Sequence, residues 1–322
     1  MDFTLSDLQL AWQSNAEALG RSLLPDSSAS QVVSEAARAG LTGPGKNLLA
    51  AAVAVEALAF ESPGAAIALA LHFSVAAGLD GDGRWAEVGS GNRVGAIALS
   101  SDEVPSEEAG RLSGRAAWVA PLTPRGIAVV GMRSGESLLA AVVELGTAEV
   151  VEERIDTAAL GGIVCGHLRF DKSAYIPGGA TMPFMACARI LLSAAGVGLG
   201  KRALREALTA ARGRTGHGAG GEQTVQGLLA DTATELDVAM LLARKAAAAP
   251  TLSLADASMA KLAATEAAQR AVARATQVVG ADAFRRAHIV EHLAQDVRAL
   301  ELFAGRTEAL REAVAMEALT RT

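Results

Sequence analysis

Three long segments in the last third of the chain, from Ala186 to Thr322, carry apolar residues at every third or fourth position. This spacing places the apolar side chains on one stripe of an α-helix. The clearest stripe comprises Val225, Leu229, Thr232, Leu236, Ala239 and Ala243. No such helix can bury its stripe alone, so the sequence predicts several helices packed side by side in a bundle.

The composition sets limits on the class of protein. At 322 residues the chain has room for two or three domains of roughly 150 residues each. With 51% hydrophobic and 20% charged residues it can bury a large core. A net charge of -6 argues against a nucleic-acid partner. Cys165 and Cys187 form neither a metal-binding nor a disulfide pattern, so we expect a reducing cytoplasm.

The sequence favours no membrane association. The start, MDFTLSDLQL, lacks the basic and apolar regions of a signal peptide. The most apolar run, AAIALALHFSVAAGL, is shorter than the roughly 20 residues that a membrane span needs and contains His72. We therefore expect this run to form a buried helix.

The predicted secondary structure changes along the first half of the chain, from helices to a glycine-rich stretch and then to strands. Residues 1 to about 80 predict helices, including Ser30–Ala39, Asn47–Phe60 and one that opens at Pro63 and ends at Gly78. A glycine-rich stretch after Asp80 predicts a linker. Short apolar runs then predict strands of a small antiparallel sheet or barrel, at Val94–Leu99, Ala116–Ala120, Gly126–Met132, Leu138–Leu145, Val150–Ile155 and His167–Phe170. Periodicity alone would also allow a helix over 138–143, where length favours a strand.

The fold class that follows is mainly α with a central β domain. The expected organisation is an N-terminal helical domain over residues 1–92, a middle β domain over 93–179 and a C-terminal helical bundle over 180–322.

Two glycine-rich segments invite a nucleotide-binding interpretation. The loop RGRTGHGAGGEQ, from Arg212 to Gln223, offers arginines and bare backbone N–H groups before a helix, which suits a phosphate. A flexible solvated connection is the more frequent meaning of such a loop. Gly196, Gly198 and Gly200 in GVGLG follow no strand, so tight helix packing is the favoured explanation.

Side chains that bear chemistry give weaker signals. His288 and His292 share a helix face, but no HExxH pattern or third ligand accompanies them, so no metal site is predicted. Four carboxylates near the end of the chain are expected to lie on solvated helix faces, namely Glu291, Asp296, Glu301 and Glu308.

The motifs in order resemble the acyl-CoA dehydrogenase family over nearly the whole chain. Gln277, Gly280, Ala281, Asp296 and Gly305 fall into the frame of the family's terminal motif without a gap. The segment RGRTG with its downstream glutamine is similar to the family's Arg-x-x-Phe-Gly turn, with Arg212, Gly216 and Gln223 matching and Thr215 replacing the Phe. SGRAAWV resembles a family strand and makes Trp118 the residue to pack beside a flavin. HLRFDKSAYIP resembles the strand that leads back into the C-terminal helices.

The resemblance implies a flavoprotein. Such proteins bind FAD between the β domain and the C-terminal bundle, and a neighbouring subunit builds part of the site. It implies that Arg212, Gln223 and the turn of Gly280 and Ala281 hold the nucleotide end of FAD. In the family's reaction a carboxylate takes the α-proton of an acyl-CoA thioester and the flavin takes the β-hydride, which yields a trans-2-enoyl-CoA.

The departures from the family concern the catalytic base. Ala304 occupies the position of the family's glutamate, in AGR rather than Glu-Gly-Thr. Some members carry the base before an arginine early in the bundle. Arg189 fits that arginine, on the substrate side, but Ala188 precedes it. The flavin-contacting segment is reduced to SSDEVPSEE, and a loop expected near 43–46 is absent. Neither base position offers a carboxylate, so no catalytic residue is assigned.

Three hypotheses remain open. The first is a subunit of a hetero-oligomeric acyl-CoA dehydrogenase, a heterotetramer of the steroid-degradation type, in which a catalytic partner chain supplies the glutamate. The second is a self-contained flavoenzyme with another base, such as Glu301 or Glu308. The third is a non-catalytic structural or assembly subunit without a cofactor.

Overall fold

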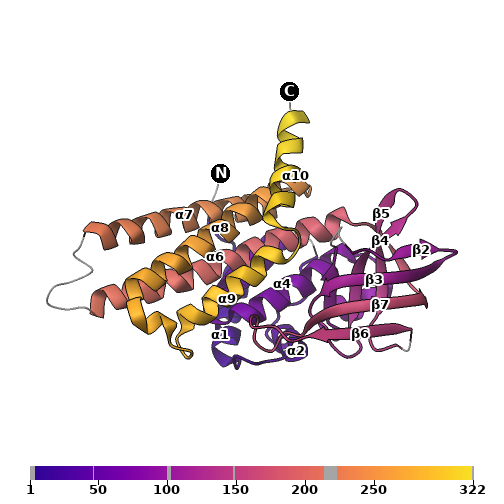
Figure 1. Cartoon of the computed structure of the whole chain (residues 1–322), viewed down its shortest axis with the longest axis horizontal. Helices are drawn as coiled ribbons and strands as arrows, with labels where there is room; N and C mark the ends of the chain where they lie inside the picture. The colour runs from indigo at the N-terminus through magenta and orange to yellow at the C-terminus, as the bar shows by residue number, and fades with distance from the viewer. Residues whose placement is uncertain (1–3, 46, 100–102, 148, 214–222, 321–322) are drawn as a thin grey trace.

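The computed structural model describes residues 4–45, 47–99, 103–147, 149–213 and 223–320. A long helical bundle forms one side of the molecule, a twisted sheet lies at one end of it, and the N-terminal helices lie beneath both (Figure 1). The order of helical, β and helical parts along the chain confirms the predicted fold class.

Four helices form the N-terminal part, and sequence signals explain where they start. They are α1 (Asp7–Ser22), α2 (Ala29–Arg38), α3 (Leu48–Glu61) and α4 (Pro63–Gly78). Ser6 caps α1 together with the Gln9 side chain, Ser28 caps α2, and Pro63 occupies the first turn of α4. Almost every residue of α3 and α4 is buried, which accounts for their uniformly apolar sequences.

The glycine-rich stretch after Asp80 is more ordered than a linker. It contains the 3-10 turn η1 (Gly83–Trp85) and the short helix α5 (Ala86–Gly89). Trp85 and Val88 are buried in the N-terminal core. Two anchoring apolar side chains therefore hold a segment whose glycines alone predict a loop.

The middle of the chain folds into one mixed sheet. Its strands are β1 (Gly95–Ala98), β2 (Ser106–Glu108), β3 (Arg111–Val119), β4 (Ile127–Ser134), β5 (Ser137–Glu144), β6 (Val150–Ile155), β7 (Cys165–Ser173) and β8 (Ile176–Ala180). The order is β6-β7-β3-β2-β4-β5-β8, and β1 pairs with β4. Of the two predicted forms, a sheet or a barrel, the open sheet is confirmed. The prediction of purely antiparallel pairing is wrong, because β1 and β2 pair with β4 in parallel.

Sequence patterns did not predict two of these strands. β2 reads Ser-Glu-Glu and has no apolar side chain to mark it. β8 reads Ile-Pro-Gly-Gly-Ala, and its proline and glycines predict a turn rather than a strand. Pro177 is accommodated because β8 is an edge strand, where one missing N–H costs little.

The C-terminal bundle is built around α6 (Met182–Gly213), which packs against α3, α4, α7 and α8. The other elements are α7 (Gln223–Ala247), α8 (Leu254–Val279), the 3-10 segment η3 (Gly280–Phe284), α9 (Ile289–Leu302) and α10 (Thr307–Thr320). The predicted α7 stripe faces the core, with Leu229 half-buried and the other five members buried. In the described part of the chain only α6 is long and apolar enough to cross a membrane, and 83% of its apolar window is buried inside the protein.

Glycines in α6 allow this close packing. A Cβ atom at Gly198 would lie 2.1 Å from the backbone oxygen of Glu56 in α3. A Cβ atom at Gly200 would lie 2.4 Å from Cδ2 of Leu236 in α7. The prediction that these glycines serve helix packing is confirmed.

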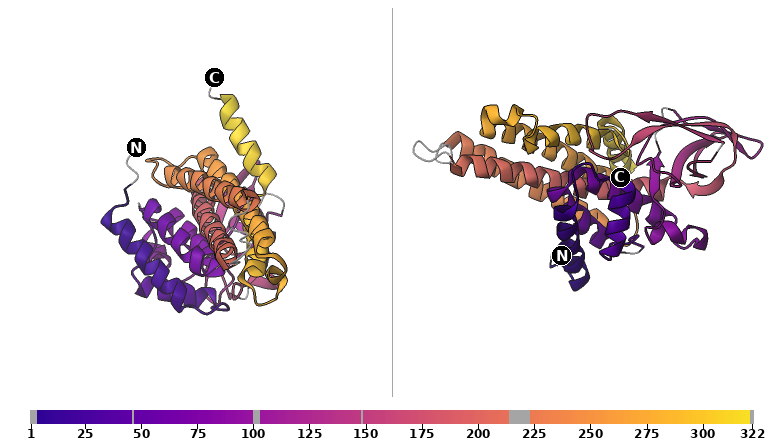
Figure 2. Two further views of the ribbon diagram at one scale, coloured as in Figure 1. Left: turned by 90° about the vertical axis from the view of Figure 1, so that its left-hand side faces the viewer. Right: turned by 90° about the horizontal axis from the view of Figure 1, so that it is seen from below.

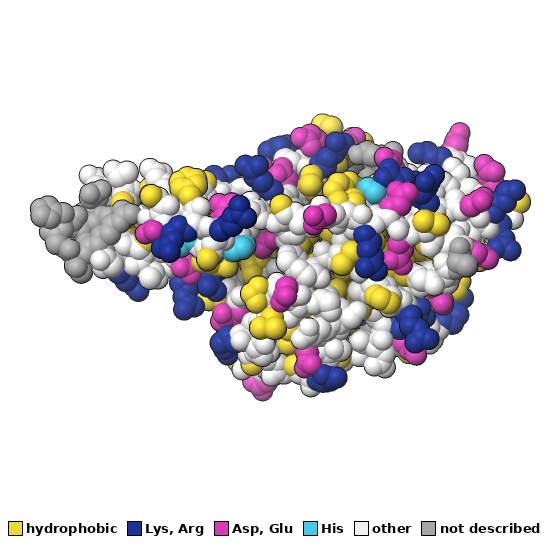
Figure 3. All heavy atoms as spheres, turned by 60° about the horizontal axis from the view of Figure 1, so that its bottom comes forward, with side chains coloured by type: hydrophobic (Ala, Val, Ile, Leu, Met, Phe, Trp, Pro, Cys, Tyr) yellow, Lys and Arg dark blue, Asp and Glu magenta, His cyan; other side chains and the backbone are white. Residues whose placement is uncertain are grey.

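The last helix leaves the body of the protein. α10 projects beyond the bundle in Figure 1 and in the left view of Figure 2, and Leu310 is its one buried residue in the described chain. Basic and acidic side chains are interspersed over the face shown in Figure 3.

Candidate functional site

Trp118 stands out on the sheet because it is aromatic, exposed and strained. Its φ of 55° is in the left-handed region and half of its surface is exposed, at 50%. The pairing of β3 with β7 shifts register between Ala116 and Val119, which is a β-bulge around Trp118. The Trp118 N–H donates to Nδ1 of His167 at 3.2 Å, and the two rings meet edge to face at 5.7 Å. The bulge thus turns a flat apolar ring toward solvent.

A second unusual segment is the turn between α9 and α10. Ala304 has φ 55° and Gly305 has φ 110°, so two consecutive residues are left-handed. Such a conformation costs a non-glycine residue about 1 kcal/mol or more. The turn lies near the sheet side of the bundle, because Asp296 in α9 accepts the N–H of Leu160 from the β6–β7 loop at 2.7 Å.

Arg189 connects α6 to this turn. Its Nε donates to the Ala304 carbonyl at 2.9 Å, and its Nη1 donates to Oγ of Ser258 in α8 at 2.6 Å. The side chain is buried, and burial lowers the Arg189 pKa to about 10. Ala188, its neighbour, is fully buried in the core. The structure thus brings Arg189 and Ala304 together through the backbone of the turn.

Lys261 is a buried cation that sequence reasoning missed. It is 0% exposed, and its Nζ donates to the carbonyls of Glu301 at 3.1 Å and Gly305 at 2.8 Å. Burial, and to a smaller extent the charge of Arg189, lower the pKa of Lys261 to about 7, while the charge of Glu301 acts in the opposite direction. A lysine in an alanine-rich amphipathic helix gives no sign of such burial, so no sequence signal could have found it.

Two of the four carboxylates expected on solvated faces accept hydrogen bonds from other segments, and one of the two is buried. Asp296 is buried, and burial raises its pKa against the opposing effect of the Leu160 N–H. Glu301 is half-buried and accepts from Nε2 of Gln269 at 2.7 Å and from Oγ1 of Thr307 at 2.9 Å. The solvated-face prediction is wrong for Asp296, which is buried because it accepts the Leu160 N–H, whereas Glu301 keeps partial access to solvent. The prediction is confirmed for Glu308, which is exposed at the start of α10.

The residues expected at a nucleotide lie at the opposite end of the bundle. Arg212 is exposed at the end of α6, and Gln223 is exposed at the start of α7. Gly280 ends α8 with φ 78°, which suits glycine, and Ala281 next to it is exposed. Figure 1 shows the ends of α6 and α8 far from the sheet that carries Trp118. Thr215 and Gly216, together with the rest of the loop over 214–222, lie outside the described residues.

Three of the described histidines, His72, His167 and His288, accept hydrogen bonds from backbone N–H groups. His288 caps α9 by accepting the Val290 N–H at Nδ1, at 3.2 Å. His72 is buried, accepts the Gly95 N–H at 3.0 Å, and has its pKa lowered to about 4 by burial. Among the residues described, no group of three or more His, Cys, Asp or Glu could hold a metal ion. Cys165 and Cys187 are free and buried, and burial raises the pKa of each thiol to about 11.

A family model matches the C-terminal part of the chain. Residues 179–319 match the model described as acyl-CoA dehydrogenase, C-terminal domain. This range holds the whole bundle, including Arg189, Lys261 and the turn at Ala304. A search of curated proteins gave no significant match.

Solved structures match the chain along its full length. Butyryl-CoA dehydrogenase from Megasphaera elsdenii is 20% identical with a TM-score of 0.88, over 99% of this chain and 100% of that one. A glutaryl-CoA dehydrogenase in complex with glutaryl-CoA is 20% identical with a TM-score of 0.88, over 99% and 97%. A protein described as PigA with FAD and proline is 20% identical with a TM-score of 0.86, over 100% of both chains. The chain therefore shares their fold.

Proposed function

Since this chain has the acyl-CoA dehydrogenase fold and its residues 179–319 form a C-terminal domain of that family, we propose that it is an FAD-binding subunit of an acyl-CoA dehydrogenase. FAD when bound accepts a hydride from the β-carbon of an acyl-CoA thioester. A carboxylate from a catalytic partner chain would take the α-proton. A steroid-derived acyl group and a cytoplasmic location complete the proposal. The first rests on the family resemblance alone, and the second rests on the absence of a metal-binding or disulfide pattern for Cys165 and Cys187.

The turn at Ala304 carries the proposal of a partner-supplied base. The side chain there is a methyl group, which cannot accept a proton. Glu301, the nearest alternative on α9, already accepts hydrogen bonds from Gln269 and Thr307. These two donors hold the carboxylate against α8 and the start of α10, which disfavours a self-contained enzyme with Glu301 as its base.

The residues at the two ends of the molecule fit FAD when two chains combine. The exposed ring of Trp118 offers a flat apolar surface of the kind on which an isoalloxazine packs. Arg212 and the left-handed Gly280 offer a guanidinium and an open backbone, which suit the pyrophosphate. Because these groups lie at opposite ends of one chain, we propose that Arg212, Gln223, Gly280 and Ala281 of one subunit complete the site that holds Trp118 in another.

Flavin content tests the proposal. The chain is purified alone and co-expressed with an acyl-CoA dehydrogenase partner chain, and the visible flavin spectrum of each preparation is recorded. Flavin in the pair, absent from the chain alone, is the expected result. Flavin bound to the chain alone, with turnover of an acyl-CoA, would favour the self-contained enzyme, and no flavin in either preparation would favour a structural subunit.

Arg212→Ala tests the nucleotide end. A charge-assisted bond to phosphate contributes about 1.5–3 kcal/mol, so FAD affinity should fall by about 10- to 150-fold. Arg205→Ala is the matched control, because Arg205 lies on the same helix and packs over Phe60 instead. Equal FAD affinity of the Arg212→Ala variant and the wild type would remove Arg212 from the site.

A further inference from the structure

Two buried cations converge on one turn. Arg189 from α6 and Lys261 from α8 donate to three carbonyls of the segment from Glu301 to Gly305, at 2.8–3.1 Å. Donors of this kind satisfy the carbonyl groups that a helix end leaves open, and their charge suits the negative end of the α9 dipole. These contacts of Arg189 and Lys261, called the tether below, thus join the segment to α6 and α8.

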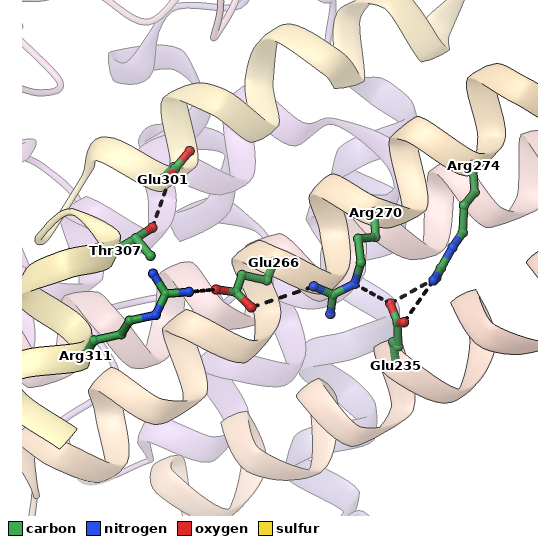
Figure 4. A network of polar contacts seen from close by, with 7 residues as sticks. All are labelled: Glu235, Glu266, Arg270, Arg274, Glu301, Thr307 and Arg311. Carbon is green, nitrogen blue, oxygen red and sulfur yellow. Dashed lines mark hydrogen bonds and ion pairs between the residues drawn. The ribbon is translucent and has the colours of Figure 1, made fainter. Parts of the chain in front are cut away.

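Among the residues that the structure describes, no side chain of opposite charge contacts Arg189 or Lys261 directly. The acceptors of both cations are backbone carbonyls and the Ser258 hydroxyl. Glu301 of α9 is the carboxylate that acts on Lys261, and its own oxygens are bonded to Gln269 and Thr307 (Figure 4 shows the bond to Thr307). Burying two like charges together is costly, and such costs concentrate at sites with a specific role.

We propose that Arg189 and Lys261 are positioning residues, which hold the turn at Ala304 and Gly305 in its left-handed form so that Ala304 leaves space for the partner's carboxylate. This inference rests on the proposed function. The left-handed Ala304 is the conformation that such an arrangement has to maintain. Neither side chain is a catalytic residue, because both act through the backbone of the turn.

The titration of Lys261 makes the opening of the turn depend on pH. Its pKa is about 7 when buried and near 10.5 in water. Protonation therefore favours any opening that exposes Lys261. The turn opens more readily as pH falls from about 10.5 towards 7, and the effect levels off below pH 7, where Lys261 is protonated in both forms. Arg189 of α6 opposes that protonation and Glu301 of α9 supports it. Between pH 8.5 and pH 6, the opening equilibrium should rise by about 30-fold.

Hydrogen exchange measures the tether without any cofactor. Exchange of peptides covering residues 297–313, corrected for intrinsic rates, is followed at pH 6, 7 and 8.5 in the full chain. Wild type should lose about 30-fold protection toward pH 6. Lys261→Met should be about 5- to 10-fold less protected than wild type at pH 8.5, because two carbonyls lose their donor, and should show no such pH response.

Lys201→Met is the matched control, since Lys201 pairs with the Glu56 carboxylate in another part of the bundle. It should keep the wild-type pH response, and slowly exchanging α6 amides report global unfolding. A flat wild-type profile, or a pH response retained in Lys261→Met, would overturn the proposal. The wild-type series decides the question if Met at position 261 prevents folding. Because no flavin is present, the outcome is separate from that of the flavin test.

Discussion

Lys261→Met should change how the free energy of unfolding depends on pH. The substitution keeps the side-chain length and removes a fully buried charge. A pKa lowered from 10.5 to about 7 corresponds to about 5 kcal/mol that the protonated form costs the folded state. Replacing buried ionic groups by apolar ones is often neutral or stabilising.

The sign follows from proton uptake. Between pH 7 and pH 10.5 the unfolded chain binds a proton at Lys261 and the folded chain does not, so rising pH stabilises the fold. From pH 6 to pH 9 this group should add about 2.5 kcal/mol to the stability of the wild type. Lys261→Met lacks this contribution, so its stability relative to wild type should decline by the same amount over that range.

Urea unfolding followed by circular dichroism at pH 6, 7, 8 and 9 measures the difference. In the difference between the two free energies of unfolding, the contributions of all titrating groups that the two proteins share cancel. Loss of the two carbonyl contacts shifts the whole Lys261→Met curve by an amount independent of pH, so the slope is the quantity that decides. Parallel curves for the two proteins would show that Lys261 is not a desolvated cation.

Other substitutions test the packing of the bundle and its link to the sheet. Gly198→Ala should lower the thermal midpoint and cost about 2–3 kcal/mol, because its methyl would lie 2.1 Å from the Glu56 backbone oxygen. Gly227 in α7 has open space around it, so Gly227→Ala should instead raise the free energy of unfolding by about 0.5–1 kcal/mol. Equal effects of the two substitutions on the thermal midpoint would refute the packing argument. Asp296→Ala should cost about 1–3 kcal/mol by leaving the buried Leu160 N–H without its acceptor, whereas Asp296→Asn retains an acceptor and should lose less in the same melts.

Local patterns were sufficient for most of the helical architecture. The spacing of apolar residues in α7 predicted its buried face, and Pro63 marked the start of α4. The glycines of α6 were correctly assigned to packing because no strand precedes them. Each of these features depends on residues close together in the sequence.

Features that depend on distant segments escaped prediction. The parallel pairing of β1 with β4 joins residues about thirty positions apart, and β2 has no pattern of its own. Asp296 is buried because Leu160, more than a hundred residues earlier, needs an acceptor. Lys261 and Arg189 meet at the turn of Ala304 only because α6 and α8 pack side by side. For the candidate site, family likeness supplied the residues, and the tertiary arrangement showed which of them lie together.

The length of α6 has a mechanical consequence. Its 32 residues run as one uninterrupted helix about 48 Å long, and Arg189 and Arg212 lie about 35 Å apart along its axis. The number of residues in α6 therefore fixes both the distance and the relative rotation between its two ends, at 3.6 residues per turn. Adding or removing one residue would rotate everything beyond it by about 100°, whereas seven residues would nearly restore the direction and change only the reach. Natural variation in this segment should accordingly be substitution rather than insertion.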